Sequence, residues 1–232
     1  MLGKKLFEDK RFSADGTVSC ANCHALDKTF ADGLSVAEGI KKLTGTRNAP
    51  TVVNAVYYTT QFWDGRRPSL EEQAKDPFLN KVEHGLKNHD PIIEIIRNDP
   101  EYVDEFKKIF NIEKESITID HVVKAIASFE RTVILGNSPF DRYQYGGDKS
   151  VISESAIRGL ELFRVKGRCV DCHAIEQTSA IFTDNKFHNI GVGFNTIEPK
   201  MFEIVDKFRE SKEKGQVIDE AILTSKDFSE LG

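Results

Sequence analysis

The hydrophobic positions of the chain recur with the period of a helix, and no segment shows the period of two that marks a half-buried strand. A capping-box pattern at Ser69-Leu70-Glu71-Glu72 predicts the start of one helix, and Pro77 predicts its end. Asp90 and Asp99 each precede a proline, which predicts two further helix starts. These signals predict an all-α fold.

Two of the predicted helices carry a clear apolar face. One begins at Asp99, and the other begins at Thr118 and ends before Gly136-Asn137-Ser138-Pro139. Residues 40–68 are predicted to be mostly loop, and the segment Met201–Lys214 is predicted to be a charged helix. The apolar faces consist of Tyr102, Val103, Phe106 and Phe110 in the first helix, and Val122, Ile126, Phe129 and Val133 in the second.

Glycine-rich breaks near the middle of the chain predict two domains. The string Gly136-Asn137-Ser138-Pro139 and the later Tyr145-Gly146-Gly147-Asp148 favour a linker over residues 136–150. This linker separates an N-terminal domain, residues 1–135, from a C-terminal domain, residues 151–232. A chain of 232 residues has room for two small domains.

Composition and charge exclude several classes of protein. Hydrophobic residues make up 39% and charged residues 30%, values typical of globular chains and not of disordered ones. No apolar stretch approaches the roughly 18 residues of a membrane-spanning helix. The net charge is −5, with both signs interspersed, so we expect no nucleic-acid partner.

The four cysteines form two copies of one pattern. These are Cys20-Ala21-Asn22-Cys23-His24 and Cys169-Val170-Asp171-Cys172-His173. The pattern Cys-x-x-Cys-His is the attachment signature of c-type haem, in which both thiols form thioethers and the histidine binds the iron. A zinc site would have to join two distant halves and leave the histidines unexplained, and a dithiol redox pair would need a βαβ context that is absent. We therefore expect two c-type haems.

The flanks of the two motifs repeat as well. Gly3-Lys4-Lys5-Leu6-Phe7 precedes the first motif, and Gly159-Leu160-Glu161-Leu162-Phe163 precedes the second. Phe30-Ala31-Asp32-Gly33 follows the first, and Phe182-Thr183-Asp184-Asn185 follows the second. The repeat indicates two related units in tandem.

The sixth ligand of each iron decides whether that iron transfers electrons or activates a small molecule. Neither haem has an obvious methionine ligand, since Met1 is terminal and Met201 stands in a charged helix that we expect to be exposed. His121 is expected to be a surface or core residue. His188 is a candidate for the pocket of the second haem.

Motifs along the whole chain resemble those of the bacterial dihaem cytochrome c peroxidases and their MauG-type relatives. They are Arg47-Asn48-Ala49-Pro50-Thr51-Val52-Val53-Asn54-Ala55, Gln61-Phe62-Trp63-Asp64-Gly65-Arg66, Leu70-Glu71-Glu72-Gln73-Ala74, Val82-Glu83-His84-Gly85 and Ser138-Pro139-Phe140-Asp141-Arg142.

The resemblance implies two cytochrome c-like domains in tandem, each with one covalently attached c-type haem. The N-terminal haem would be peroxidatic and the C-terminal haem would receive electrons. Trp63 matches a tryptophan that lies between the haems, and Glu83 matches the distal carboxylate. Gln73 matches an amide of the distal pocket, and Asn48 matches a ligand of a calcium ion. Without the resemblance, each residue has a structural alternative. Trp63 could be an indole packed in the core, and Glu83 could be a solvated charge at a helix end.

The implied activity is that of a cytochrome-c peroxidase, the two-electron reduction of hydrogen peroxide to water. A small redox protein, either a monohaem cytochrome c or a copper protein, would supply the electrons, and homodimers are typical of the family. Two alternatives stay open. One is a dihaem electron carrier without enzyme activity, and the other is a MauG-type enzyme that oxidises a protein substrate.

Three departures from the family pattern change these expectations. Glu38 stands where many members have a histidine that blocks the N-terminal haem, so this haem is expected to be open, although His84 or His89 could reach the iron. A methionine-bearing segment that usually lies beyond the position of Gly232 is missing. No signal-peptide pattern follows Met1, although haem attachment of this type occurs outside the cytoplasm. We therefore expect an exported, periplasmic protein, of which this sequence is a fragment at both ends.

Overall fold

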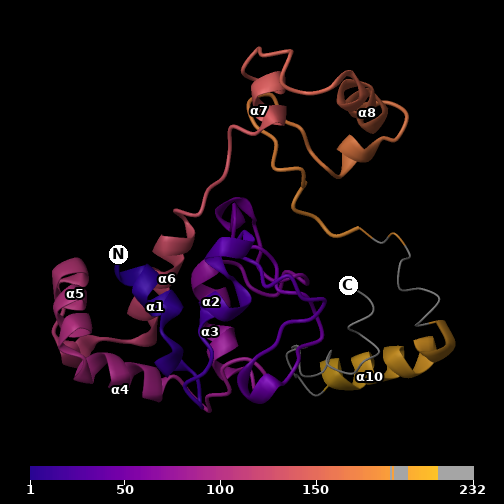
Figure 1. Ribbon diagram of the computed structural model, residues 1–232. Coiled ribbons are helices and arrows are strands. Elements are labelled where there is room, and N and C mark those ends of the chain that lie inside the picture. The colour runs from indigo at the N-terminus through magenta and orange to yellow at the C-terminus, as the bar shows by residue number, and fades with distance from the viewer. Residues whose placement is uncertain (189, 191–197, 214–232) are drawn as a thin grey trace. The chain divides into compact units, whose positions relative to one another are not determined.

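The computed structural model in Figure 1 describes residues 1–188, 190 and 198–213. These residues form helices joined by loops, and their only β-type pairings are isolated bridges such as Gln61 with Arg67. The all-α prediction is thereby confirmed for the part of the chain that is described. None of the described helices is long and apolar enough to cross a membrane.

The chain divides into two compact units. The first consists of Met1–Val56, Thr60–Val133 and the described residues that follow His188, and the second of Tyr57–Thr59 and Ile134–His188. The α-helices of the first unit are α1 (Leu2–Glu8), α2 (Cys20–Cys23), α3 (Leu70–Leu79), α4 (Asp90–Asn98), α5 (Pro100–Phe110), α6 (Ile119–Glu130) and α10 (Met201–Glu213). Those of the second unit are α7 (Pro139–Gln144) and α8 (Glu154–Arg164).

Helices α1 and α6 pack tightly at the centre of the first unit. A Cβ atom on Gly3 would lie 1.9 Å from the carbonyl oxygen of Ala125, so the backbones approach as only glycine permits. Phe7 meets Phe129 edge to face, with ring centroids 5.3 Å apart. Helix α3 packs against the same helix α6. These contacts form one apolar core. The first Cys-x-x-Cys-His motif lies next to it, since Cys20 packs against that core.

All four predicted helix starts hold, one of them with a shift, and Ser69 caps α3 as predicted. Asp99 caps α5 by accepting hydrogen bonds from the backbone N–H groups of Glu101 and Tyr102. Thr118 caps α6. Helix α4 begins at Asp90 itself, one residue earlier than predicted, with His89 as its cap.

Pro77 does not end α3, which continues to Leu79. Proline removes one backbone hydrogen bond from a helix, but here Phe78 is 1% exposed and its burial holds the last turn in place. The helix ends where Asn80 adopts an extended backbone while its N–H still donates to the Asp76 carbonyl. The predicted end was therefore wrong by one turn.

Helix α6 ends at Glu130, earlier than the predicted end near Gly136. The backbone N–H and the hydroxyl of Thr132 both donate to the Phe129 carbonyl, at 2.8 and 2.7 Å. The Val133 carbonyl accepts from the backbone N–H of Asn54 at 2.9 Å. These bonds turn the chain out of the helix before the glycine is reached.

The second unit has a smaller core. Phe182 contacts Phe140 of α7 and Phe163 of α8, with centroids 5.0 and 6.5 Å apart. The Tyr145 hydroxyl donates to the Glu176 carbonyl at 3.0 Å. No residue of α8 is fully buried. This unit therefore rests on a few aromatic contacts around the second motif.

The charged helix predicted at Met201–Lys214 is present as α10, Met201–Glu213. Lys214 lies outside the described residues.

Candidate haem sites

The first Cys-x-x-Cys-His motif forms a short helix with its histidine directly behind it. Ser19 and Asn22 cap α2 reciprocally, and the His24 backbone N–H donates to the Cys20 carbonyl at 2.9 Å. One helical turn separates Cys20 from Cys23, so both thiols face the same side. Both are free thiols. This arrangement suits two thioether bonds to one edge of a haem.

His24 is oriented by a backbone carbonyl. Its Nδ1 lies 3.4 Å from the Phe30 oxygen, and because a carbonyl only accepts, the Nδ1–H donates. The ring lies next to Phe7, with centroids 6.2 Å apart. Burial lowers the pKa of His24, which keeps the ring neutral, the form that binds metals. Nε2 is therefore the nitrogen available to iron.

The second motif repeats this geometry. Its 3₁₀ turn spans Cys169–Asp171, and the His173 backbone N–H donates to the Cys169 carbonyl at 2.8 Å. His173 Nδ1 donates to the Phe182 carbonyl at 3.0 Å, and the Phe163 ring lies 6.0 Å from the imidazole. The repeated segments before and after each motif thus have the same structural role in both units. Each places one phenylalanine beside the histidine and the carbonyl of another on its Nδ1.

These observations test whether the chain fits c-type haem, and it does at both motifs. Each motif offers two free thiols and a histidine with a defined tautomer. Within the described ranges, no group of three or more His, Cys, Asp or Glu side chains gathers as a metal-ion site. The calcium ion expected at Asn48 stays a prediction.

The two units differ in how the helix before the motif is covered. In the first, Gly3 lies against α6. In the second, a Cβ on Gly159 would meet nothing within 4 Å, and Leu162 is 55% exposed. In the described part of the second unit, the helix before the motif is therefore less covered by other residues than in the first unit.

Glu83 lies beside the first motif because of the loop that follows that motif. A Cβ on Gly39 would lie 1.8 Å from the Val82 carbonyl oxygen, so the loop presses against the segment of Glu83. Cys23 Sγ lies 3.8 Å from the Glu38 carbonyl oxygen. Burial, and after it the charge of Glu83, raises the pKa of the Cys23 thiol to about 12. The loop thus brings the backbone of Glu38, the thiol of Cys23 and the carboxylate of Glu83 together.

A tight turn holds the Glu83 side chain. The Asn80 amide donates to Glu83 Oε1 at 2.7 Å, and the Asn80 carbonyl accepts from the backbone N–H groups of Glu83 and Gly85. Gly85 has φ +73°, a conformation that favours glycine. Glu83 is half-buried, so its carboxylate is positioned by the turn.

The other predicted site residues also belong to the first unit. Trp63 is 55% exposed, and its indole N–H donates to the Asn48 carbonyl at 2.9 Å. A packed core indole is therefore not its role in the described structure. The Asn48 amide donates to the Leu34 carbonyl. Gln73 is half-buried in α3. The structure thus brings Asn48 together with Trp63, and Glu83 together with Cys23.

The remaining histidines have structural partners. His84 is 3% exposed, and its Nδ1–H donates to the Phe12 carbonyl at 2.9 Å. His89 donates to a backbone carbonyl of α3 at 3.0 Å, and His121 completes the cap of α6 as the surface role predicted for it allows. His188 donates to Asp184 at 2.8 Å. Among these, only His84 is fully buried, and it lies in the core.

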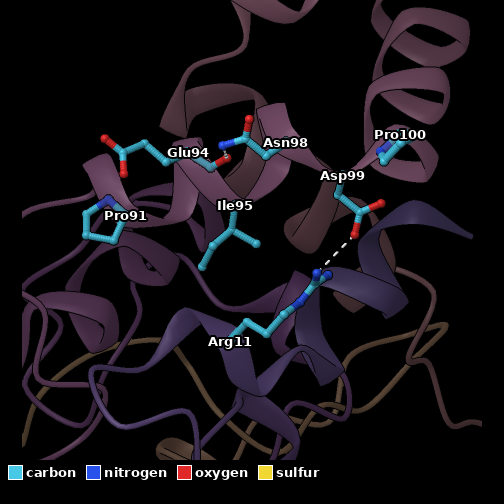
Figure 2. Close-up of a pocket in the computed structure, with 7 residues that line it drawn as sticks. All are labelled: Arg11, Pro91, Glu94, Ile95, Asn98, Asp99 and Pro100. Atoms are coloured by element: carbon cyan, nitrogen blue, oxygen red, sulfur yellow. Dashed lines mark hydrogen bonds and ion pairs between the residues drawn. The ribbon is translucent and has the colours of Figure 1, made fainter.

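A surface hollow between α4, α5 and the turn Lys10–Phe12 contains none of the predicted site residues (Figure 2). Arg11 crosses it and pairs with Asp99 at 3.0 Å. Both ionic partners are therefore already engaged with each other. The residues that line the hollow are Arg11, Pro91, Glu94, Ile95, Asn98, Asp99 and Pro100.

Comparison with known proteins decides the family. The family profile described as "Di-haem cytochrome c peroxidase" matches residues 1–150. The chain belongs to this family. It is 38% identical over 172 residues to "Cytochrome c peroxidase Ccp" of Escherichia coli (strain K12), covering 74% of this chain and 36% of that protein. It is 40% identical over 191 residues to "Methylamine utilization protein MauG" of Methylorubrum extorquens, covering 82% of this chain and 52% of that protein.

Solved structures of the dihaem family share the fold. A "MauG-like protein associated with microbial copper homeostasis" superposes with a TM-score of 0.69 at 30% identity, covering 81% of this chain and 55% of that one. The "diheme peroxidase BthA" of Burkholderia thailandensis has a TM-score of 0.69 at 24% identity, which shows the fold alone. The chain spans about a third to a half of the length of the relatives named here. Membership of this family implies haem cofactors.

Sequence reasoning about this dihaem peroxidase homologue missed Glu130. This carboxylic acid is 5% exposed, and one of its oxygens, Oε2, has no hydrogen-bond partner. A signal was present, because Glu130 follows Ile126 by four residues and Val123 by seven and so lies on the apolar stripe of α6.

Proposed function

We propose that this chain forms part of a cytochrome-c peroxidase that binds one c-type haem at each motif and reduces hydrogen peroxide to water at the N-terminal one. The observation that carries the proposal is the half-buried carboxylate of Glu83, which a tight turn holds within electrostatic reach of the haem anchor Cys23. A protein that only carried electrons would not need a positioned carboxylate there.

Six residues would hold the haems. Cys20 and Cys23 would form the thioethers of the first haem and His24 its iron ligand, through Nε2. Cys169, Cys172 and His173 would do the same for the second haem. The bound haems supply the redox chemistry of peroxide reduction.

Glu83 is proposed to move the proton that peroxide reduction requires. Cleavage to water needs a proton transferred from the inner to the outer oxygen of peroxide, and a positioned carboxylate performs this as base and then as acid. The Asn80 amide on Oε1 fixes the direction of the carboxylate. Gln73 is proposed as an amide hydrogen-bond donor of the same pocket.

Trp63 is proposed to relay electrons between the haems. Its indole is exposed, and one hydrogen bond to the Asn48 carbonyl fixes it. In this proposal residues 1–135 form the peroxidatic domain, residues 136–150 the linker and residues 151–232 part of the electron-accepting domain. Asn48 would contribute one oxygen to a calcium site.

The proposal extends to location and partners. The electron donor would be a small redox protein, either a monohaem cytochrome c or a copper protein, and the enzyme would be a periplasmic homodimer. Covalent attachment of haem to two Cys-x-x-Cys-His motifs supports export.

Replacement of Glu83 tests the proposal. Glu83→Gln keeps the shape and removes the base, so peroxide turnover should fall by about 10²- to 10⁴-fold while both haem spectra stay unchanged. Glu94→Gln, on the exposed side of α4, is the matched control and should keep full turnover. Wild-type turnover in Glu83→Gln would contradict the role of this carboxylate.

The 40% identity to MauG supports a second candidate, the oxidation of a protein substrate by the same haem pair. The two functions differ in their products. A peroxidase consumes peroxide rapidly when a reduced cytochrome c is supplied. A MauG-type enzyme consumes peroxide slowly and leaves a covalent modification on a partner, which mass spectrometry would detect.

A further inference from the structure

Glu130 is a buried carboxylic acid that the proposed reaction does not use. It ends α6 and is 5% exposed. Ala127, one turn earlier on the same helix, is completely buried and packs with Ala55 and Leu70. Glu130 therefore stands at the end of an apolar contact surface between α6 and α3, where a carboxylate is unusual.

Glu130 lies close to the first haem anchor. Burial and then the charge of Glu130 raise the pKa of the Cys20 thiol above its ordinary value. The carboxyl group is thus within electrostatic reach of the residue that would bond to the haem edge. Helix α1 packs against both α6 and α2, and Cys20 packs against the core that contains Phe129, the neighbour of Glu130.

No cation neutralises Glu130 in the described structure. The neighbouring Arg131 is directed at Glu71 of α3, with two hydrogen bonds of 2.6 and 3.0 Å, and Glu130 Oε2 is buried without a partner. Burial raises the pKa of Glu130 to about 8, and the charge of Arg131 lowers it only in part. The group therefore titrates close to neutral pH, where a change in nearby charge can shift its protonation.

Several other charged groups on the packed helices form ion pairs with one another. They are Lys4 with Glu8, Lys5 with Glu101 and Glu105, and Lys75 with Glu72 and Asp120.

We propose that Glu130 is the proton-binding residue coupled to the N-terminal haem. When that haem accepts one electron from the donor, the carboxylate takes up one proton from solvent and becomes the neutral acid. When the electron leaves, the proton returns to solvent. The inference rests on the proposed attachment of haem at Cys20, Cys23 and His24.

Electrostatics gives the reason for this coupling. Reduction removes one positive charge from the haem, and in a buried setting a nearby carboxylate then binds a proton more strongly. Linkage makes the effect reciprocal, so protonation of Glu130 favours the reduced state. The residue would offset the buried charge that each electron delivers before peroxide reacts.

The test is the pH dependence of the reduction potential of the N-terminal haem, measured by optical titration of the full dihaem holoprotein. In the wild type this potential should fall as pH rises between about 6 and 9. Glu130→Gln should flatten the dependence in that range. Glu105→Gln is the matched control, since Glu105 also has a buried oxygen without a partner but lies on α5 beside Lys5, and it should keep the slope.

A second measurement keeps the inference testable if Glu130→Gln folds poorly. Infrared difference spectra of the wild type, reduced minus oxidised, should show the carbonyl band of a protonated carboxylic acid that shifts in heavy water. An unchanged slope in Glu130→Gln, or the absence of this band, would overturn the inference. Haem content, measured separately, distinguishes this result from a failure of the proposed function, since a chain without the N-terminal haem would overturn both.

Discussion

At the scale of single residues, the orientation of His24 and His173 explains the repeated flanks of the motifs. In each unit the Nδ1–H of the histidine donates to a phenylalanine carbonyl, at 3.4 and 3.0 Å. This bond selects the tautomer with a free Nε2 and increases the basicity of the ligand. Phe30 and Phe182 act through their backbone carbonyls, and their side chains contact the rings of Phe129 and Phe163.

His84 provides a residue-scale prediction about pH. Burial lowers the pKa of His84 below its ordinary value of 6.5, so the unfolded chain binds a proton more readily than the folded one. Stability is therefore present above that value and is lost as pH falls through the folded pKa. Between about pH 7.5 and pH 5.5 the denaturation midpoint of the holoprotein should fall more in the wild type than in His84→Asn. Equal changes in the two proteins would contradict this account.

The sequence was sufficient to predict the haem-binding residues as candidates but not their surroundings. Spacing alone singled out Cys20, Cys23 and His24. That Glu83 lies near Cys23 depends on the loop contact at Gly39, which joins residues distant in sequence. Their assigned roles stay predictions until tested.

At the scale of elements, the loop after the first motif controls the position of Glu83. Backbone bonds at Ala37, Gly39 and Ile40 close this loop on itself and onto the Glu83 carbonyl. The Ile40 N–H donates to that carbonyl at 3.0 Å. The loop therefore fixes the backbone of Glu83, and Asn80 holds its carboxylate.

Gly39→Ala tests this dependence. The new Cβ would lie 1.8 Å from a backbone oxygen, which cannot move as a side-chain end could. We expect a loss of about 1–3 kcal/mol of stability and a lower rate of peroxide turnover as Glu83 is displaced. Gly136→Ala, where a Cβ meets nothing within 4 Å, is the control and should behave as wild type. Denaturant unfolding and turnover measured on the same samples would show whether the two losses occur together.

The same loop carries a prediction about haem coordination. Glu38 is exposed, and its carbonyl lies 3.8 Å from Cys23 Sγ. If Glu38 stands at the place of the blocking histidine of other family members, Glu38→His should convert a high-spin N-terminal haem to a low-spin one in the oxidised protein. Glu38→Gln should stay high-spin. An electron paramagnetic resonance (EPR) spectrum of Glu38→His identical to that of wild type would show that this position does not reach the iron.

Helix existence was predictable from sequence, whereas two helix ends were not. A helix cap such as Asp99 depends on residues close to it in the sequence, so the sequence predicts it directly. Pro77 was overridden by the burial of Phe78, and α6 ended early because Val133 hydrogen-bonds to Asn54. Both exceptions come from tertiary contacts, which local signals do not contain.

At the scale of the whole molecule, the two related units differ in the surroundings of their motifs. The first unit has a fully buried core, a closely packed helix behind its motif and the carboxylates Glu83 and Glu130 near its cysteines. In the described part of the second unit, a Cβ on Gly159 would meet nothing within 4 Å. In the proposed function, the first unit would act on peroxide and the second would transfer electrons to it.

The two-unit division also explains why peroxide reduction would need the complete holoprotein. Reduction of hydrogen peroxide to water requires two electrons, and two haems can store one each. The chain spans 36% of the Escherichia coli relative and 52% of the Methylorubrum extorquens relative. Measurements of turnover therefore belong on the full-length dihaem protein.

The EPR spectrum of that oxidised holoprotein, recorded before and after one equivalent of hydrogen peroxide, tests the central claim most directly. We predict a high-spin signal from the N-terminal haem that is present without prior reduction and disappears when peroxide is added. Two low-spin signals that do not respond to peroxide would contradict the account and identify an electron carrier.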